Sequence, residues 1–311
     1  MHDLLQIGGI TDPMRDRLKK AFTIHKLDDG TYPADTITHI ATNGHDGVPA
    51  DVMAALPNLQ MISCYGVGYD AIDTTSAAER GILVTHTPNV LNQEVATTTI
   101  LLLLAVYRNF LHDEAYARSG QWEAEGNAPL SRSVDGVTVG ILGLGRIGQA
   151  IADKLTAFDA DIHYHSRNPK EVEYTYHANL VDMANTVDVL ICITPGGPAT
   201  NKIVNTEVIN ALGPKGTLIN VSRGSVIDEE AMVAALQDGR LGYAGLDVFE
   251  AEPKIPKALK SMPNVVLLPH VGSATIETRG AMGGLVVDNL ISHLDSGRVL
   301  TPVPETAHLN P

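Results

Sequence analysis

The chain has 311 residues, of which 44% are hydrophobic and 19% are charged, a composition typical of a folded globular protein and not of a disordered one. Its 22 basic and 36 acidic residues give a formal net charge of −14, which disfavours nucleic acids and anionic membranes as partners because both attract cationic surfaces. At roughly 100–200 residues per domain, the length predicts two domains.

No stretch of the sequence has the pattern of a membrane span or a secretory signal. The longest apolar run, Ile100–Val106, is far shorter than the roughly 20 residues that a bilayer requires. The chain begins Met-His-Asp, without a basic region followed by an apolar stretch. Cys64 and Cys192 both lie in apolar runs, where buried, reduced thiols are expected. These features predict a cytoplasmic protein.

The first third of the chain alternates short apolar runs with helical stretches, which is typical of a small α/β unit. The expected strands are Ile37–Thr42, Met61–Cys64 and Ile82–Thr85, and the expected helices lie near Asp51–Leu56 and Ile72–Arg80. A Leu-rich helix is then expected over Gln93–Phe110, with an apolar face broad enough for burial between domains or subunits. The segment that follows, Ser119–Asp135, is expected to be irregular.

From Val137 onward, continuous apolar runs alternate with helices, which predicts a parallel sheet covered on both faces. The expected strands are Val137–Leu142, Asp161–His165, Val187–Thr194, Gly216–Val221, Tyr243–Val248 and Val265–Leu268. The expected helices are Ile147–Phe158, Leu180–Asn185, Glu207–Leu212, Glu229–Asp238 and a last one near Ile276–Leu294. The Pro-rich tail can complete the first unit only by crossing back. The predicted domains are therefore residues 1–94 with 284–311, and residues 95–283.

A glycine-rich segment, Gly143–Gly148, fits the pattern G-x-G-x-x-G with Arg146 and Ile147 inside it. It directly follows a predicted strand and opens a predicted helix, the context in which this pattern binds a dinucleotide. Gly143 permits the tight turn, Gly145 lets the backbone approach the pyrophosphate, and Gly148 allows close helix–strand packing. The helix N-terminus adds amide donors and positive potential. The alternative is a strand–helix turn whose glycines serve packing alone.

The end of the second strand bears on the choice of cofactor. NAD-specific sites usually place an acid there, about 20 residues after the turn, to bind the ribose 2′-hydroxyl. Here the strand ends in Ser166 and Arg167, while Asp159 and Asp161 lie at its other end. A guanidinium at this place favours a 2′-phosphate, so NADPH is the expected cofactor, with NADH possible. The alternative is that Arg167 is only a solvated surface residue.

Candidate catalytic residues lie in three segments that each follow a predicted strand, where ligands bind in open α/β sheets. Arg223 can bind a substrate carboxylate and polarise a carbonyl. His270 is a natural acid/base, and Glu252 can hold its ring and stabilise the imidazolium. Each has a plainer interpretation, as a salt-bridge partner, a surface acid or a packed histidine. The segments are Asn220–Gly224, Leu246–Pro253 and Leu268–Ser273.

The other histidines do not predict a metal site. His86, His163 and His165 have no carboxylate or cysteine at metal-ligand spacing, and no zinc signature is present. The expected electrophile is therefore Arg223 and not a metal.

Five motifs together resemble the D-isomer-specific 2-hydroxyacid dehydrogenases, and among them the glyoxylate/hydroxypyruvate reductases. The resemblance covers essentially the whole chain. The motifs are Gly66–Asp70, Leu142–Gly148, Asn220–Gly224, Asp247–Pro253 and Pro269–Ser273.

The resemblance implies a Rossmann-type, parallel-sheet nucleotide-binding domain and a smaller, flavodoxin-like substrate domain made of both chain ends. It implies Arg223, Glu252 and His270 as the catalytic set, and a homodimer built on Gln93–Phe110. The substrate carboxylate would be held by the amides of Val67 and Gly68 beside Arg223, with His270 and Ser273 also at the substrate. Thr194 and Pro195 would line the adenosine side of the cofactor, and Val221 and Asp247 the nicotinamide side.

The leading functional hypothesis is an NADPH-dependent reductase of small 2-oxo acids such as glyoxylate and hydroxypyruvate. A second hypothesis is a reductase of a longer sugar-derived 2-oxo acid such as 2-ketogluconate. A third, from another class, is a nucleotide-sensing binding protein with negligible turnover. The intact set of Arg223, Glu252 and His270 disfavours the third.

Overall fold

The computed structural model describes residues 1–311 and divides into two compact units. The terminal unit consists of Met1–Leu91 and Ala274–Pro311, and the central unit of Asn92–Ser273. The sequence placed the boundaries after residues 94 and 283, whereas the structure has them after Leu91 and Ser273. The second boundary lies earlier because the last helix, α11 (Ile276–Ser296), packs against strand β4 and helix α1 of the terminal unit.

The terminal unit is built on a five-stranded parallel sheet with strand order β2-β1-β3-β4-β5. This is the flavodoxin-like order, so the predicted fold of this unit is confirmed. Strands β1 and β2 and helix α1 were not expected, because their short segments mix polar with apolar residues. The elements are β1 (His2–Gln6), α1 (Asp12–Leu18), β2 (Phe22–Lys26), β3 (Ile37–Asn43), α2 (Ala50–Ala54), β4 (Met61–Tyr65), α3 (Thr74–Glu79), β5 (Leu83–Thr85) and α11.

The central unit is built on a seven-stranded parallel sheet with strand order β12-β11-β10-β9-β6-β7-β8. Starting from β6, the chain first adds β7 and β8 on one side and then returns to add β9 to β12 on the other side. This change of direction between β6 and β9 is typical of a Rossmann fold. The strands are β6 (Thr138–Leu142), β7 (Asp161–His165), β8 (Thr175–Tyr176), β9 (Val189–Cys192), β10 (Thr217–Asn220), β11 (Tyr243–Leu246) and β12 (Val265–Leu267). The helices are α4 (Asn92–Tyr107), α5 (Phe110–Arg118), α6 (Gln121–Glu125), α7 (Arg146–Leu155), α8 (Leu180–Thr186), α9 (Thr206–Leu212) and α10 (Glu229–Asp238).

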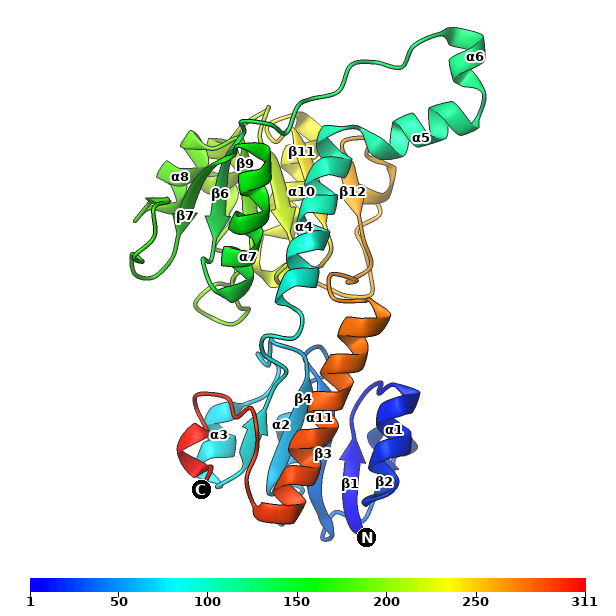
Figure 1. The fold of residues 1–311 in the computed structure, drawn as a ribbon, viewed down its shortest axis with the longest axis vertical. Helices are drawn as coiled ribbons and strands as arrows, with labels where there is room; N and C mark the ends of the chain where they lie inside the picture. Colours follow the sequence, from blue (N-terminus) through cyan, green and yellow to red (C-terminus); the bar gives the residue numbers. More distant parts are fainter. The chain divides into compact units, whose positions relative to one another are not determined.

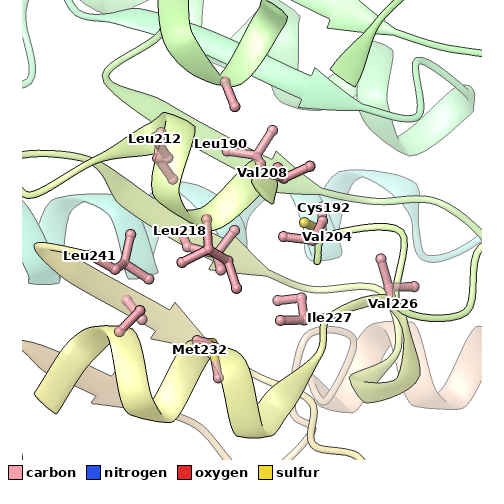
Figure 2. Packing of buried hydrophobic residues seen from close by; sticks show 14 of the residues in the cluster. Leu190, Cys192, Val204, Val208, Leu212, Leu218, Val226, Ile227, Met232 and Leu241 are labelled. Atoms are coloured by element: carbon pink, nitrogen blue, oxygen red, sulfur yellow. The ribbon is translucent and has the colours of Figure 1, made fainter. Parts of the chain in front are cut away.

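Both faces of this central sheet are buried, as continuous apolar strands require. On one face, Leu190 and Leu218 pack in a cluster with Val208 of α9 and Met232 of α10 (Figure 2). Each such side chain contributes about 1.5–3 kcal/mol when it is fully buried. On the other face, α4 approaches Gly245 of β11 so closely that an added Cβ would lie 3.3 Å from Leu102. The glycine therefore lets a helix lie flat on the sheet.

The helix expected over Gln93–Phe110 is shorter than predicted. It ends at Tyr107, and the chain turns through Asn109, whose φ of 51° is in the left-handed region that asparagine tolerates. Helix α5 starts there, and α5 and α6 extend away from the sheet of the central unit (Figure 1). Part of the segment expected to be irregular, Ser119–Asp135, is thus helical.

No single helix is long and apolar enough to cross a membrane. Helices α4 and α5 meet that test only when taken together, and they are bent by 63° at their junction.

Candidate active site

The glycine-rich turn between β6 and α7 has the geometry of a dinucleotide-binding turn. Gly143 has a φ of 103°, and a Cβ there would lie 2.8 Å from the carbonyl oxygen of Ile193. A Cβ on Gly148 would lie 2.3 Å from the carbonyl oxygen of Gly143, so close packing of the helix requires glycine. A Cβ on Gly145 would meet nothing within 4 Å. The turn is therefore packed on one side and open where a pyrophosphate would approach.

Strand register places the other predicted cofactor residues at the same edge of the sheet. Leu142 of β6 is paired with Cys192 of β9, Cys192 with Asn220 of β10, and Asn220 with Leu246 of β11. The residues that directly follow these strands therefore lie along one carboxyl edge, where open α/β sheets bind ligands. Beyond the glycine turn, the exposed Arg146 and the half-buried Ile147 at the start of α7, they include Thr194, Pro195, Val221 and Asp247.

The end of β7 carries no acid in the place where NAD-specific proteins have one. Asp161 is the first residue of that strand, and its carboxylate bonds to His163. The Ser166 hydroxyl donates to the carbonyl of Asn168 over 2.7 Å. Arg167 is exposed and forms no hydrogen bond or ion pair with the rest of the chain. Its guanidinium is thus available to an anion.

Arg223 lies in a tightly held turn after β10. The Asn220 side chain accepts a hydrogen bond from the Ser222 amide (3.1 Å) and donates to the Arg223 carbonyl (2.9 Å). A Cβ on Gly224 would lie 1.9 Å from the carbonyl carbon of Phe249. The turn that carries Arg223 is therefore packed directly against the turn that leads to Glu252.

Glu252 and His270 form a hydrogen-bonded pair. The Nδ1–H of His270 donates to Oε2 of Glu252 over 2.7 Å, and Oε1 of Glu252 accepts from the Phe249 amide over 3.0 Å. The Glu252 side chain is 16% exposed and the His270 side chain 42%. The carboxylate bonds to Nδ1 on the more buried side of the ring. The other ring nitrogen, Nε2, can therefore give or take a proton at the surface of the site.

Asp247 has a role in this site that the sequence did not indicate. Its carboxylate accepts the amides of Val271 (2.7 Å) and Gly272 (2.8 Å), and its carbonyl accepts the amide of His270 (2.8 Å). Burial raises the pKa of Asp247, and the two amide hydrogen bonds oppose that shift. His270 itself has a φ of 54°, in the left-handed region. Asp247 therefore shapes the turn that presents the imidazole. Ser273, three residues after His270, is the last residue of the central unit.

Val67 and Gly68 belong to the terminal unit, in the loop that follows β4. The carbonyls of this loop all point toward the protein: that of Gly66 accepts from the Thr87 amide (2.8 Å), that of Val67 from the His86 ring (2.9 Å) and that of Gly68 from the Cys64 thiol (3.7 Å). The amides of Val67 and Gly68 donate to no acceptor in the chain. These two successive N–H groups are therefore available to an anionic ligand.

These features agree with the comparisons with known proteins. Residues 100–272 match the NAD binding domain of the D-isomer specific 2-hydroxyacid dehydrogenases. The 2-ketogluconate reductase of Gluconobacter oxydans is 42% identical over 305 residues, which is 97% of this chain and 98% of that protein. The chain belongs to the D-isomer specific 2-hydroxyacid dehydrogenase family. The predicted resemblance is thereby confirmed.

Two further members of this family resemble the chain closely. The hydroxyphenylpyruvate reductase of Plectranthus scutellarioides is 47% identical over 271 residues, 87% of this chain and 86% of that protein. A crystal structure of the NADPH-dependent glyoxylate/hydroxypyruvate reductase of Sinorhizobium meliloti, in complex with NADP and malonate, is 49% identical with a TM-score of 0.93. That likeness covers 98% of each chain. The protein is thus an oxidoreductase of a family that uses NAD(P).

Proposed function

We propose that the protein reduces small 2-oxo acids, glyoxylate and hydroxypyruvate, to D-2-hydroxy acids with NADPH. The observation that carries this proposal is the Glu252–His270 pair, held at 2.7 Å at the same sheet edge as the dinucleotide turn and the Arg223 turn. A proton donor and a cation at that edge meet the two needs of carbonyl reduction in a carboxylate substrate.

The residues divide the chemistry as follows. NADPH, when bound, supplies a hydride to the carbonyl carbon. Arg223 binds the substrate carboxylate and stabilises the negative charge that develops on the carbonyl oxygen. His270 gives its proton to that oxygen, and Glu252 stabilises the ring while it carries the proton. The open amides of Val67 and Gly68 supply further donors to the carboxylate.

The preference for NADPH is supported by the end of β7. An exposed guanidinium there, with no acid beside it, suits a 2′-phosphate better than a ribose hydroxyl. The Sinorhizobium meliloti relative is described as NADPH-dependent and was crystallised with NADP. We therefore propose that Ser166 and Arg167 hold the 2′-phosphate, with NADH used weakly.

The substrate is tested by steady-state rates of NADPH oxidation with glyoxylate, hydroxypyruvate and 2-ketogluconate side by side. We expect the highest kcat/KM with glyoxylate or hydroxypyruvate. The Gluconobacter oxydans relative favours 2-ketogluconate as the second candidate, and a higher kcat/KM with that acid would replace the first proposal. A protein that binds NADPH but turns over none of these acids would instead be a nucleotide-sensing protein.

We also propose a homodimer that buries the apolar surface of α4, α5, α6 and the segment after α6. Five large apolar side chains in this region are more than half exposed, namely Leu101, Phe110, Leu111, Trp122 and Leu130. Exposed apolar patches of this kind mark protein interfaces. The proposal includes the expected Gln93–Phe110 segment and extends beyond it. Sedimentation velocity should give a dimer, and Leu111→Asp should shift it toward monomer; a monomeric parent protein would refute the dimer.

A cytoplasmic location stays a prediction, which cell fractionation would test.

A further inference from the structure

His86 lies beside the loop of Val67 and Gly68, at a place where no role was expected for it. It follows β5 directly, and its backbone is held on both sides by Thr301 of the C-terminal segment. The His86 amide donates to the Thr301 carbonyl over 3.3 Å, and the Thr301 hydroxyl donates to the His86 carbonyl over 2.6 Å. The position of His86 is therefore fixed independently of the loop that it contacts.

The ring of His86 bonds to one particular peptide group. Its Nδ1 lies 2.9 Å from the carbonyl oxygen of Val67. Because a carbonyl can only accept, Nδ1 must carry the hydrogen. The carbonyl of Val67 and the amide N–H of Gly68 belong to the same planar peptide unit and point in opposite directions. A bond that holds the carbonyl on one side therefore aims the N–H on the other.

We infer that His86 is a positioning residue for the substrate carboxylate, acting through the Val67–Gly68 peptide. The inference rests on the proposed function, in which the Gly68 amide binds that carboxylate. His86 fixes the plane of the peptide, so that the N–H does not have to be oriented when substrate binds. The bond also polarises the peptide and strengthens the N–H as a donor. Both the neutral and the protonated ring can carry a hydrogen on Nδ1, so this role persists across the pH range of the reaction.

The surroundings of His86 keep the ring in this orientation. The ring of Tyr69 meets it edge to face, with centroids 5.2 Å apart and an interplanar angle of 88°. The Tyr69 hydroxyl donates to Glu305 over 3.2 Å. Burial, reinforced by the negative charge of Glu305, raises the pKa of Tyr69 to about 12, so its hydroxyl stays a donor. Thr301 is in turn bonded to the buried side chain of Asn289. The C-terminal segment thus supports the loop through His86 and Tyr69.

The decisive comparison is between two replacements of His86. In His86→Asn the side-chain amide can place a donor near the position of Nδ1, whereas His86→Leu fills similar space without a donor. Loss of one orienting bond should raise the KM for glyoxylate roughly three- to tenfold in His86→Leu, with kcat and the KM for NADPH nearly unchanged. His86→Asn should stay within about twofold of the parent protein.

His25→Ala is the matched control. His25 also makes one side-chain hydrogen bond in the terminal unit, to Asp3 over 2.9 Å, but it lies on β2, away from the loop. A loss of general stability would affect both variants, whereas a raised KM for glyoxylate is expected only in His86→Leu. Should that variant not fold, His86→Ala with added imidazole replaces it, and imidazole should lower its KM again. An unchanged KM in His86→Leu, or an equal rise in His86→Asn, would overturn the inference.

A binding measurement separates this inference from the proposed function. The amide resonance of Gly68 is followed by NMR while malonate, a dicarboxylate that is not reduced, is added to the protein with NADP. In the parent protein malonate should shift this resonance, and half-saturation should require roughly three- to tenfold more malonate in His86→Leu. A parent protein that reduces no 2-oxo acid would refute the proposed function while this result could still stand. A Gly68 resonance that malonate leaves unmoved would overturn the inference.

Discussion

His270 and Glu252 meet through a 2.7 Å hydrogen bond in which the carboxylate is the more buried partner. The His270 ring is the more exposed of the two side chains, so it is the group presented at the surface of the site. Since Glu252 is also held by the Phe249 amide, it fixes the ring in one orientation. The pair therefore presents a proton-donating group in a fixed geometry, which reduction of a carbonyl requires.

Turnover in both directions should depend on this pair. Glu252→Gln replaces the carboxylate that accepts from the ring with an amide, which loses the charge-assisted hydrogen bond and can turn its NH₂ group toward Nδ1. The ring should then be held less firmly, so kcat should fall about tenfold or more both for reduction and for oxidation of the hydroxy acid. The measurement is steady-state kinetics in both directions. Glu250→Gln, two residues away, is the control, and an unchanged kcat in Glu252→Gln would remove Glu252 from this role.

Arg223 should be the residue whose loss damages both binding and chemistry. Arg223→Lys keeps the positive charge but loses the planar fork that binds a carboxylate through two hydrogen bonds. Removal of one donor to a developing oxyanion typically costs about 100-fold or more in rate, and we expect a loss of that order in kcat/KM. Steady-state rates with glyoxylate measure it. Near-normal kcat/KM in this variant would show that Arg223 acts only in the packing of its turn.

Asp247 should matter for both stability and turnover. In Asp247→Asn one carboxylate oxygen becomes an NH₂ group, which cannot accept the Val271 or Gly272 amide that it then faces. An unsatisfied buried amide costs about 1–3 kcal/mol, so the free energy of unfolding should fall by that amount. The His270 turn should loosen at the same time, which lowers kcat more than it changes the KM for NADPH. Urea unfolding and steady-state kinetics together test this, and unchanged values in both would contradict the assigned role.

The buried His39 should make the protein less stable in acid. Burial, with a smaller contribution from His293, lowers the pKa of His39 to about 3. The folded protein therefore resists a proton that the unfolded chain accepts near pH 6.5, so stability is full above pH 6.5 and falls as the pH drops toward 3. The expected slope is about 1.4 kcal/mol per pH unit from this group. Urea midpoints between pH 8 and 4.5 measure it, with a shallower decline expected in His39→Asn. The exposed His112→Asn is the control, and equal slopes in all three proteins would refute the assignment.

The sequence predicted the architecture well where local pattern and tertiary environment agree. Strand β7 and helix α10 have the bounds that their periodicity indicated, Asp161–His165 and Glu229–Asp238. Strands β1 and β2 were not predicted, because their polar residues interrupt the run of apolar residues that indicates a buried strand. The break at Asn109 was missed because Phe110 and Leu111 continue the apolar pattern of α4 without being buried.

For the proposed site, the sequence pointed to Arg223, Glu252 and His270 as candidates but not to the groups that hold them. The bonds of Asp247 to the His270 turn depend on the register of β11 and β12, which no local pattern encodes. The contact of His86 with Val67 joins two loops that are adjacent only because β4 and β5 are paired. Such supporting interactions are set by the tertiary fold, and only the structure reveals them.

Cofactor preference should be set by Arg167 with help from Ser166. The 2′-phosphate carries nearly two negative charges, and each charge-assisted hydrogen bond to it contributes on the order of 1.5–3 kcal/mol. Because Arg167 is exposed, solvent screens the interaction, so we expect the lower end of that range and a preference for NADPH of about tenfold or somewhat more. NADH only leaves the guanidinium hydrated, which costs little, so weak use of NADH is expected.

Replacing both Ser166 and Arg167 should reverse the preference for NADPH over NADH. Ser166→Asp combined with Arg167→Ile supplies an acceptor for the ribose 2′-hydroxyl and repels the phosphate, so the double variant should favour NADH. The measurement is kcat/KM with each cofactor in the parent protein, in the double variant and in Arg167→Ala. Arg146→Ala is a suitable control, because it removes an exposed arginine from the start of α7 without touching the end of β7. Its ratio of NADPH to NADH should change far less than that of Arg167→Ala. A parent protein that prefers NADH, or unchanged discrimination in Arg167→Ala, would mean that Arg167 is a solvated surface residue and that the missing acid after β7 does not select the cofactor.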